Sequence, residues 1–367
     1  MARPILLASL LALALTAASP ATAHEYRIET VAEGLEFPWS IAFLPDGRLL
    51  VTERAGRLRV IEDGQLEETP VSGVPEAHVR SQAGLFEVML DPGYADNGWL
   101  YLSLAHGSAA ANSTRVVRAR LVGNALEDLE VVFTAEPARN TSVHYGARMA
   151  FLADGSLVVG LGDGFNFRED AQRLDSHTGA IVRIWPDGRV PADNPFIGRA
   201  DARPEIYSYG HRNVQGLVFD AQRGLLWAHE HGPRGGDELN LILPGRNYGW
   251  PVATHGVDYS GARISPYASR PGMEDPRVDW TPSIAPSGMT VYRGDQFPDW
   301  QGDLFVTALV AREVRRIQLD GERVVGQESL FGEIGERLRD IKTGPDGALY
   351  VLTDSPRGRV LRIAAAP

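Results

Sequence analysis

The sequence of 367 residues contains no cysteine. Thiolate nucleophiles, disulfides, zinc–cysteine sites and iron–sulfur clusters are therefore excluded, and any redox chemistry must come from a bound cofactor. Lysine is almost absent too: Lys342 is the one lysine among 36 basic residues, so a single side chain is available for Schiff-base chemistry. Basic charge is in the minority, because 47 acidic residues give a formal net charge of −11. This balance argues against nucleic acid as a partner.

Long apolar runs are also lacking: no 18 uninterrupted apolar residues occur, so membrane insertion is not expected. The N-terminus carries Arg3, an apolar run over residues 5–15 and the triplet Ala21-Thr22-Ala23, which is the pattern of a secretory signal. We expect residues 1–23 to be a cleaved signal peptide and residues 24–367 to be one periplasmic or secreted domain. A buried N-terminal helix is the alternative.

Six units repeat along the chain, each with a short apolar run, a turn rich in Pro, Asp and Gly, and a second apolar run. Residues 41–51 and 149–159 are the clearest. The first runs end near Phe43, Met89, Phe151, Phe219, Val291 and Thr343, about 60 residues apart on average. The pattern predicts an all-β fold, a six-bladed β-propeller of four-stranded antiparallel blades. A β-sandwich or two unrelated β-domains would be the alternative.

Polar and aromatic residues precede the first run of each unit at a similar distance. If the units are blades, this shared phase brings them to one rim of the central channel. An arginine taken alone is more often part of a surface ion pair, but several arginines at one rim would suit a planar ligand with carboxylates. The rim residues are Trp39, Gln82, His144, Arg212, Asn213, Ser283, Arg337 and Arg339.

Two further segments carry candidate chemistry. Asp163 lies one hairpin beyond His144, where it could accept one imidazole proton and leave the other nitrogen free as a base. Residues 229–240 form a loop rich in Gly, Pro and carboxylates, the oxygen-rich character that Ca²⁺ prefers. The pair His229 and His231 could instead bind zinc, or the loop could serve only as a turn.

Several segments together resemble the glucose/sorbosone dehydrogenase family. The similarity runs in order from about Gly34 to Ile363, and the short loops resemble those of the periplasmic aldose sugar dehydrogenases within that family. The segments are His144-Tyr145-Gly146-Ala147-Arg148 and residues 160–163, 209–216, 230–240, 247–251 and 337–354. The resemblance implies a six-bladed propeller enzyme that uses pyrroloquinoline quinone (PQQ) and Ca²⁺.

Carried over by position, the resemblance implies His144 as the catalytic base, Asp163 as the residue that orients it and Arg212 beside the reacting carbonyl of PQQ. A family lysine that contacts the cofactor falls at Val310, so Arg312 is the candidate to replace its charge. The implied cofactor-binding set is Gln82 on the substrate side, with Arg212, Asn213, His231, Ser283, Arg312, Arg337 and Arg339. The implied metal ligands are Gly232 and Pro233 for the Ca²⁺ on the cofactor, and Glu238, Tyr248 and Asp258 for a second Ca²⁺.

The function implied by the resemblance is oxidation of the anomeric hydroxyl of an aldose to a lactone, with hydride transfer to the quinone and electrons passed to an external acceptor. Two other classes stay open on the residues. One is a Ca²⁺-dependent propeller lactonase or other hydrolase, which would need a metal held by carboxylates at the channel centre. The other is a non-catalytic sugar-binding propeller. The protein would act as a monomer or a homodimer.

Overall fold

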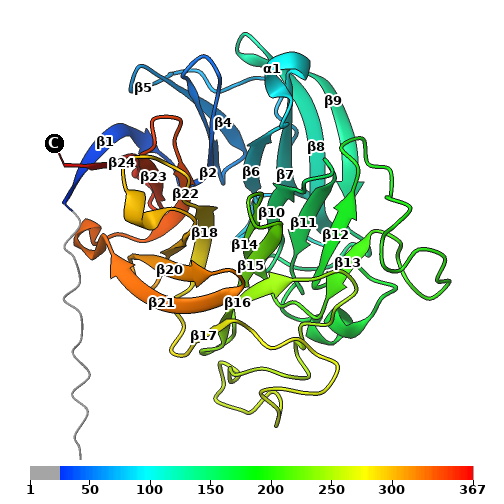
Figure 1. Ribbon diagram of the computed structural model, residues 1–367. Coiled ribbons are helices and arrows are strands. Elements are labelled where there is room, and N and C mark those ends of the chain that lie inside the picture. The colour runs from blue at the N-terminus through cyan, green and yellow to red at the C-terminus, as the bar shows by residue number, and fades with distance from the viewer. Residues whose placement is uncertain (1–24, 367) are drawn as a thin grey trace, which may run out of the picture.

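A computed structural model describes residues 25–366, and the strands in this part of the chain form six four-stranded antiparallel sheets in a ring (Figure 1). The predicted six-bladed propeller is therefore confirmed. The expected signal peptide, residues 1–23, lies outside the described residues. Within residues 25–366, no helix is long and apolar enough to cross a membrane.

The blades follow one another in chain order, and each is described from its innermost strand outward. Blade one contains β2 (Pro38–Phe43), β3 (Leu49–Glu53), β4 (Arg57–Glu62) and β5 (Gln65–Leu66). Blade two contains β6 (Leu85–Leu90), β7 (Trp99–Gly107), β8 (Asn112–Val122) and β9 (Ala125–Thr134). Blade three contains β10 (Gly146–Phe151), β11 (Leu157–Leu161), β12 (Ala180–Ile184) and β13 (Ile206–Tyr209).

The second half of the ring has the same plan. Blade four contains β14 (Val214–Asp220), β15 (Leu225–Glu230), β16 (Asp237–Ile242) and β17 (Val278–Trp280). Blade five contains β18 (Pro286–Val291), β19 (Leu304–Ala308), β20 (Val314–Asp320) and β21 (Arg323–Leu330). Blade six contains β22 (Leu338–Thr343), β23 (Leu349–Thr353), β24 (Gly358–Ala365) and β1 (Tyr26–Leu35). Short helical turns lie between strands: α1 (Tyr94–Asn97), η1 (Arg168–Gln172), η2 (Pro298–Trp300) and η3 (Gly332–Ile334).

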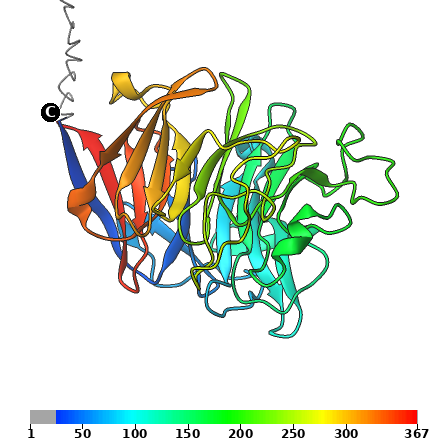
Figure 2. The same ribbon diagram turned by 90° about the horizontal axis from the view of Figure 1, so that it is seen from below.

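Blade six is completed by the first strand of the chain. β1 pairs antiparallel with β24, from Tyr26 opposite Ala365 to Leu35 opposite Gly358. Both views show these strands, blue and red, side by side (Figures 1 and 2). The ring is thereby closed by hydrogen bonds between its two ends, which the repeat pattern alone did not reveal.

Each interface between neighbouring blades holds one cluster of buried apolar side chains. Between blades one and two, for example, Leu50 and Leu102 are fully buried in one cluster. The alternation of apolar residues in the repeats produces these faces, because successive strand residues point to opposite sides of a sheet. Truncating one such leucine to alanine costs about 2–5 kcal/mol, so the interfaces fix the blades around the channel.

The innermost strand of every blade carries a register shift directly after its first residue. One extra residue is inserted there relative to the neighbouring strand, which is the character of a β-bulge. Because a bulge redirects side chains, the six bulges decide which side chains enter the channel near its mouth. The residues at the bulges are Trp39, Phe86-Glu87, Ala147-Arg148, Gln215, Ser287-Gly288 and Arg339.

Candidate active site

Three cavities lie where the inner strands begin. The first, the His144 cavity, has a volume of about 460 Å³ and includes Gln82, His144 and Phe165 in its lining. The second, the Arg212 cavity, has a volume of about 390 Å³ and is lined in part by Asp163, Arg212 and Pro233. The third, the channel cavity, has a volume of about 230 Å³. It is lined in part by Trp39, Arg54, Gln82, Asn213, Gln215, His231, Arg337, Arg339 and Asp354.

Shared lining residues connect the cavities. Gln82 lines both the His144 cavity and the channel cavity, while Phe165 and Tyr259 line both the His144 cavity and the Arg212 cavity. In antiparallel blades the start of the first strand and the end of the second lie at one edge. The predicted rim residues therefore meet at one mouth, together with residues that follow β3, β11, β15 and β23.

His144 and Asp163 form a buried pair at this mouth. His144 Nδ1 lies 2.7 Å from Asp163 Oδ1, and both side chains are nearly inaccessible to solvent. The second oxygen of Asp163 accepts a hydrogen bond from the indole Nε1 of Trp250 at 2.8 Å, and the main-chain N–H of Phe165 also donates to Asp163. The carboxylate thus accepts a hydrogen bond from the Nδ1–H of the neutral imidazole, which leaves His144 Nε2 unprotonated.

The electrostatics of this pair favour a neutral imidazole. Burial lowers the pKa of His144 below its usual value, and Arg212 adds to this effect, against the opposing hydrogen bond to Asp163. Burial acts to raise the pKa of Asp163, but the hydrogen bond with His144 and the charge of Arg212 outweigh it and hold that pKa below its usual value. At neutral pH the pair is therefore a neutral base beside an ionised carboxylate.

The local backbone is arranged to bring these two residues together. A Cβ on Gly162, the residue after β11, would lie 2.0 Å from the carbonyl oxygen of His144, so only glycine permits the chain there to approach the loop before β10 so closely. His144 itself has a positive φ of 54°. Its main-chain N–H donates to Gln82 Oε1 at 2.9 Å. Gln82 thus fixes the His144 loop from blade two.

Arg212 is held beside the His144–Asp163 pair by the neighbouring blade four, and its carbonyl oxygen accepts a hydrogen bond from the N–H of Asp163 at 2.8 Å. Its main-chain N–H donates to the carboxylate of Glu230, which also lies 2.9 Å from His211 Nδ1. Its guanidinium Nη1 donates to the carbonyl oxygens of His231 at 2.9 Å and Gly232 at 2.6 Å. Arg212 Nε has no hydrogen-bond partner among residues 25–366 although it is buried. A buried donor without a partner is costly and points to a ligand.

The channel cavity is predominantly cationic. Arg54, Arg337 and Arg339 line it, with Asp354 as the one carboxylate in its lining. Asp354 is 3.1 Å from Arg337 Nε and 3.3 Å from Arg339 Nη2. Arg339 Nε is buried and has no hydrogen-bond partner within the described residues. These guanidinium groups fit a ligand with several carboxylates.

Polar side chains complete the channel cavity. Asn213 Oδ1 accepts hydrogen bonds from the N–H of Gly146 and from Gln215 Nε2, both at 3.2 Å. Burial lowers the pKa of His231 to about 4, so its imidazole is neutral. Its Nε2 lies 2.7 Å from the carbonyl oxygen of Pro286 and donates to it. The amide and the imidazole come from blade four, and the guanidinium groups of the lining come from blades one and six.

Two predicted cofactor-binding residues line none of the three cavities just described. The hydroxyl of Ser283 donates to Asp237 at 2.5 Å. Arg312 is exposed, and its guanidinium donates to the carbonyl oxygen of Gly335 at 3.2 Å. Val310 beside it is 61% exposed. In this structure Arg312 therefore does not bring its charge to the channel cavity, and Arg54 does.

The predicted metal ligands fall into two places. Gly232 and Pro233 lie at the mouth, where the Gly232 carbonyl already faces the positive charge of Arg212. Asp258 lines the same Arg212 cavity and lies 3.5 Å from Arg168 Nη1. Glu238 is on β16, and the hydroxyl of Tyr248 donates to the carbonyl of Leu241 at 2.7 Å. Asp258 is thus grouped with Pro233 rather than with Glu238.

The zinc alternative finds no support in the side-chain arrangement. Within residues 25–366, no group of three or more His, Asp or Glu side chains is placed to hold a metal ion. His229 is fully buried and its ring packs against Gly216, where a Cβ would lie 2.1 Å from Nε2. His231 Nε2 is engaged with Pro286. The two imidazoles therefore do not act as a pair.

Sequence reasoning missed several residues of the mouth. Phe165 and Tyr259 are exposed aromatic side chains whose rings stack 6.2 Å apart between the His144 and Arg212 cavities. Arg54 and Asp354 follow the second strands of their blades. Comparing the residues that follow the second apolar run of each repeat would have identified Arg54 and Asp354. Tyr259 lies in a long loop outside the repeats, so no such comparison reaches it.

Known proteins resemble this chain over nearly its whole length. The sequence profile described as Glucose / Sorbosone dehydrogenase matches residues 35–362. Aldose sugar dehydrogenase YliI of Escherichia coli is 41% identical over 353 residues, which cover 95% of this chain and 94% of that protein. The crystal structure of the soluble aldose sugar dehydrogenase of Escherichia coli in the apo-form has a TM-score of 0.89 at 39% identity and covers 93% of this chain and 100% of that chain. The PQQ-bound form of an aldose sugar dehydrogenase of Streptomyces coelicolor has a TM-score of 0.74 at 29% identity and covers 94% and 100%.

Proposed function

Because the chain belongs to the glucose/sorbosone dehydrogenase family and is an oxidoreductase acting on sugars, we propose that it oxidises the anomeric hydroxyl of aldoses to lactones with PQQ as its cofactor. The observation that carries the proposal is the buried pair of His144 and Asp163 beside a cationic channel cavity. The pair provides a base for a hydroxyl, and the cavity provides binding for a polyanion. The His144 cavity and the channel cavity adjoin at one mouth, because Gln82 lines both cavities.

His144 accepts the proton of the sugar hydroxyl at Nε2. Asp163 holds Nδ1 protonated through the 2.7 Å contact and stabilises the positive charge that the imidazole gains. Trp250 keeps the carboxylate in place by its hydrogen bond to Asp163 Oδ2. Arg212, from the neighbouring blade four, would place a fixed positive charge where negative charge develops during the oxidation.

PQQ fits the channel cavity on the chemistry of its donors. Arg337 and Arg339 are placed to bind carboxylates, and Asn213, His231 and Gln82 supply polar contacts in the same lining. The buried Nε atoms of Arg212 and Arg339, which lack partners within residues 25–366, support a bound anion. When bound, PQQ supplies the acceptor for two electrons and Ca²⁺ supplies a Lewis acid, neither of which the chain itself contains.

The main-chain carbonyls of Gly232 and Pro233 are the proposed Ca²⁺ ligands at the mouth. The Gly232 carbonyl accepts a hydrogen bond from the Arg212 guanidinium and has a second lone pair for a further contact. Carbonyl oxygens are ordinary Ca²⁺ ligands. Glu238, Tyr248 and Asp258 stay proposed ligands of a second Ca²⁺, although Asp258 lies with Pro233 in the Arg212 cavity.

The carboxylates of the channel argue against the hydrolase alternative. A metal-dependent hydrolase would need free carboxylates at the channel centre. Glu87 and Asp340 are the buried carboxylates on β6 and β22 there, and both are paired with Arg148, while Lys342 also contacts Glu87. The one lysine is thereby engaged in an ion pair as well.

The direct test adds PQQ and Ca²⁺ to purified apo-protein and follows reduction of an artificial dye with a panel of aldoses. We expect a change in the PQQ absorption spectrum on binding and dye reduction that depends on the sugar. His144→Ala is the matched control, because it should bind PQQ and fail to turn over. A parent protein that binds sugar but no PQQ would indicate the non-catalytic sugar-binding alternative. Absence of a spectral change together with absence of dye reduction by every aldose would overturn the proposal.

The cellular setting follows from the N-terminal pattern. We propose that residues 1–23 are a cleaved signal, so that residues 24–367 meet aldoses and an external electron acceptor in the periplasm or outside the cell. Mass determination of the mature protein tests this, with cleavage after Ala23 as the expected result. The oligomeric state, monomer or homodimer, is measured in the same sample by light scattering.

A further inference from the structure

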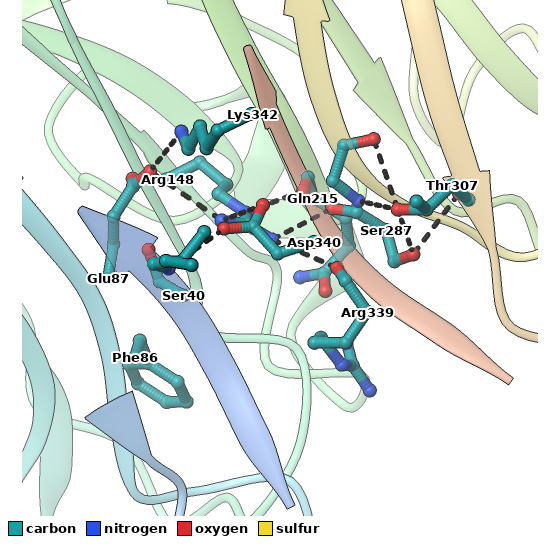
Figure 3. Close-up of polar contacts among 12 residues, drawn as sticks. Ser40, Phe86, Glu87, Arg148, Gln215, Ser287, Thr307, Arg339, Asp340 and Lys342 are labelled. Atoms are coloured by element: carbon teal, nitrogen blue, oxygen red, sulfur yellow. Dashed lines mark hydrogen bonds and ion pairs between the residues drawn. The ribbon is translucent and has the colours of Figure 1, made fainter. Parts of the chain in front are cut away.

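One buried arginine contacts all five other blades. Arg148 lies at the bulge of β10 in blade three and is 2% exposed. Its Nη1 lies 3.0 Å from Asp340 Oδ1 in blade six and 3.5 Å from Glu87 Oε1 in blade two. Figure 3 shows the guanidinium between these two carboxylates.

The remaining contacts of Arg148 reach the other three blades and return to blade six. Its Nε donates to the carbonyl oxygen of Gln215 in blade four at 2.9 Å. Its Nη2 donates to the carbonyl oxygens of Ser287 in blade five at 3.2 Å and Arg339 in blade six at 3.3 Å. Its guanidinium carbon lies 4.0 Å from the ring centroid of Trp39 in blade one. Several of these residues are labelled in Figure 3.

Three of the residues held by Arg148 line the channel cavity, although Arg148 itself does not. They are Trp39, Gln215 and Arg339. For Arg339 the hold is double, because Arg148 binds its carbonyl oxygen and the side chain of the next residue, Asp340. Asp340 in turn accepts a hydrogen bond from the N–H of Ile41 at 3.2 Å. Arg148 thus holds the β22 bulge that carries Arg339 through the main chain of Arg339 and the side chain of Asp340.

The charges of this cluster are balanced. Arg148 and Lys342 are matched by Glu87 and Asp340, with Lys342 Nζ 3.3 Å from Glu87 Oε1. Burying such a network is not an efficient way to gain stability, because a well-packed apolar cluster often serves equally well. What the network supplies that apolar side chains would not is a planar fork with fixed directions toward several carbonyl oxygens.

We infer that Arg148 is a positioning residue for the cofactor, which sets the channel cavity by holding the main chain of Arg339 and the ring of Trp39. This inference rests on the proposed PQQ site. It assigns a role in cofactor affinity to a side chain that touches neither substrate nor cofactor. It predicts that Arg148 acts through Arg339.

The test compares Arg148→Lys with Arg316→Lys. Lysine keeps the charge but cannot make the directed contacts of the guanidinium fork. Arg316 is a matched control: it is 6% exposed, it lies 2.8 Å from Asp303 and 3.2 Å from Glu328, and it is on β20 of blade five, outside the lining of the channel cavity. The dissociation constant of PQQ is measured by titration in Ca²⁺ buffer, and the melting temperature of each apo-variant is measured in parallel.

We expect Arg148→Lys to raise the PQQ dissociation constant about tenfold. Arg316→Lys should lower the melting temperature of the apo-protein about as much as Arg148→Lys does. It should change the PQQ dissociation constant by less than about twofold. Arg339→Ala then provides a double-mutant cycle. Because Arg148 acts through Arg339, Arg148→Lys should cost less than about twofold when Arg339 is already alanine.

Three results would overturn the inference: an unchanged constant in Arg148→Lys, the same loss in Arg316→Lys, or a full loss in the Arg339→Ala background. If Arg148→Lys does not fold, Asp340→Asn replaces it, since this isosteric change weakens the ion pair that holds β22 and should weaken PQQ binding likewise. A parent protein that binds no PQQ would refute the proposed function itself, whereas equal binding by parent and variants would refute only the role of Arg148.

Discussion

Trp250 donates its indole N–H to Asp163 at 2.8 Å, through the carboxylate oxygen that His144 does not use. The imidazole and the indole therefore share one carboxylate, which is nearly inaccessible to solvent. The indole belongs to the long loop after β16, so under the proposed mechanism this loop would help to orient Asp163, which in turn orients the proposed base His144.

Replacing Trp250 by phenylalanine removes this N–H and keeps most of the ring. We expect kcat to fall roughly tenfold, because a hydrogen bond to a charged group is worth about 1.5–3 kcal/mol and its loss loosens Asp163. PQQ affinity should be kept. Trp280→Phe is the matched control, since its indole donates to Gln327 at 2.9 Å in a blade interface. A Trp280→Phe variant that loses kcat equally would contradict the specific role of Trp250.

Replacing His144 by alanine removes the proposed base. Turnover should fall by at least the ~10²-fold typical of a missing general base, whereas PQQ binding should stay near that of the parent. Arg339→Ala should show the reverse pattern, with weaker PQQ retention as its main effect. Steady-state rates at saturating PQQ and a PQQ titration separate the two properties. Equal loss of both in the two variants would argue against separate roles.

The pH dependence of kcat reports the protonation of His144. Burial lowers the pKa of this imidazole below its usual value of about 6.5, so the base is neutral at neutral pH and becomes inactive only as pH falls below that value. The rate should therefore stay level from about pH 7 to 6.5 and decline further to the acid side.

Asp163→Asn supplies the control for the pH profile. The Asp163 charge raises the pKa of His144, so its removal should move the acid limb to still lower pH while reducing the rate itself. A limb that begins above pH 7, or one that does not move in Asp163→Asn, would mean that another group controls the profile.

The repeats allowed the six blades and most rim residues to be predicted, because apolar alternation and turn residues are local signals. The closing strand Tyr26–Leu35 was not predictable in the same way. Its partner strand β24 lies at the other end of the chain, and only tertiary pairing selects it. The prediction of one rim succeeded because residues of equal phase in a repeat must occupy equivalent places.

Burial is the property that the sequence did not reveal. Arg148 and Arg312 look alike in an arginine-rich chain, yet one is buried among five blades and the other is exposed. The difference arises from the bulge in β10, which directs Arg148 into the channel. No local pattern in the sequence marks such a bulge. Val310 had suggested Arg312 as a cofactor ligand, and the structure instead places Arg54 in the lining.

Glu238 should make the free energy of unfolding depend both on pH and on the second proposed Ca²⁺. Burial and the charge of Glu230 raise the pKa of Glu238 well above its usual value. A carboxyl whose pKa is higher in the folded state binds its proton more tightly there, so without metal the free energy of unfolding should fall as pH rises from the ordinary glutamate pKa through the raised one. A bound cation would offset this loss by pairing with the ionised carboxylate.

Glu238→Gln removes the titrating group and tests this account. At pH 7.5 in chelator, we expect the variant to melt at least as high as the parent, because no buried charge has to form. Adding Ca²⁺ should raise the melting temperature of the parent by about 2 °C or more and that of Glu238→Gln by clearly less. Calorimetry in chelator and in Ca²⁺ measures both shifts. An equal Ca²⁺ response in the two proteins would mean that Glu238 does not bind the stabilising ion.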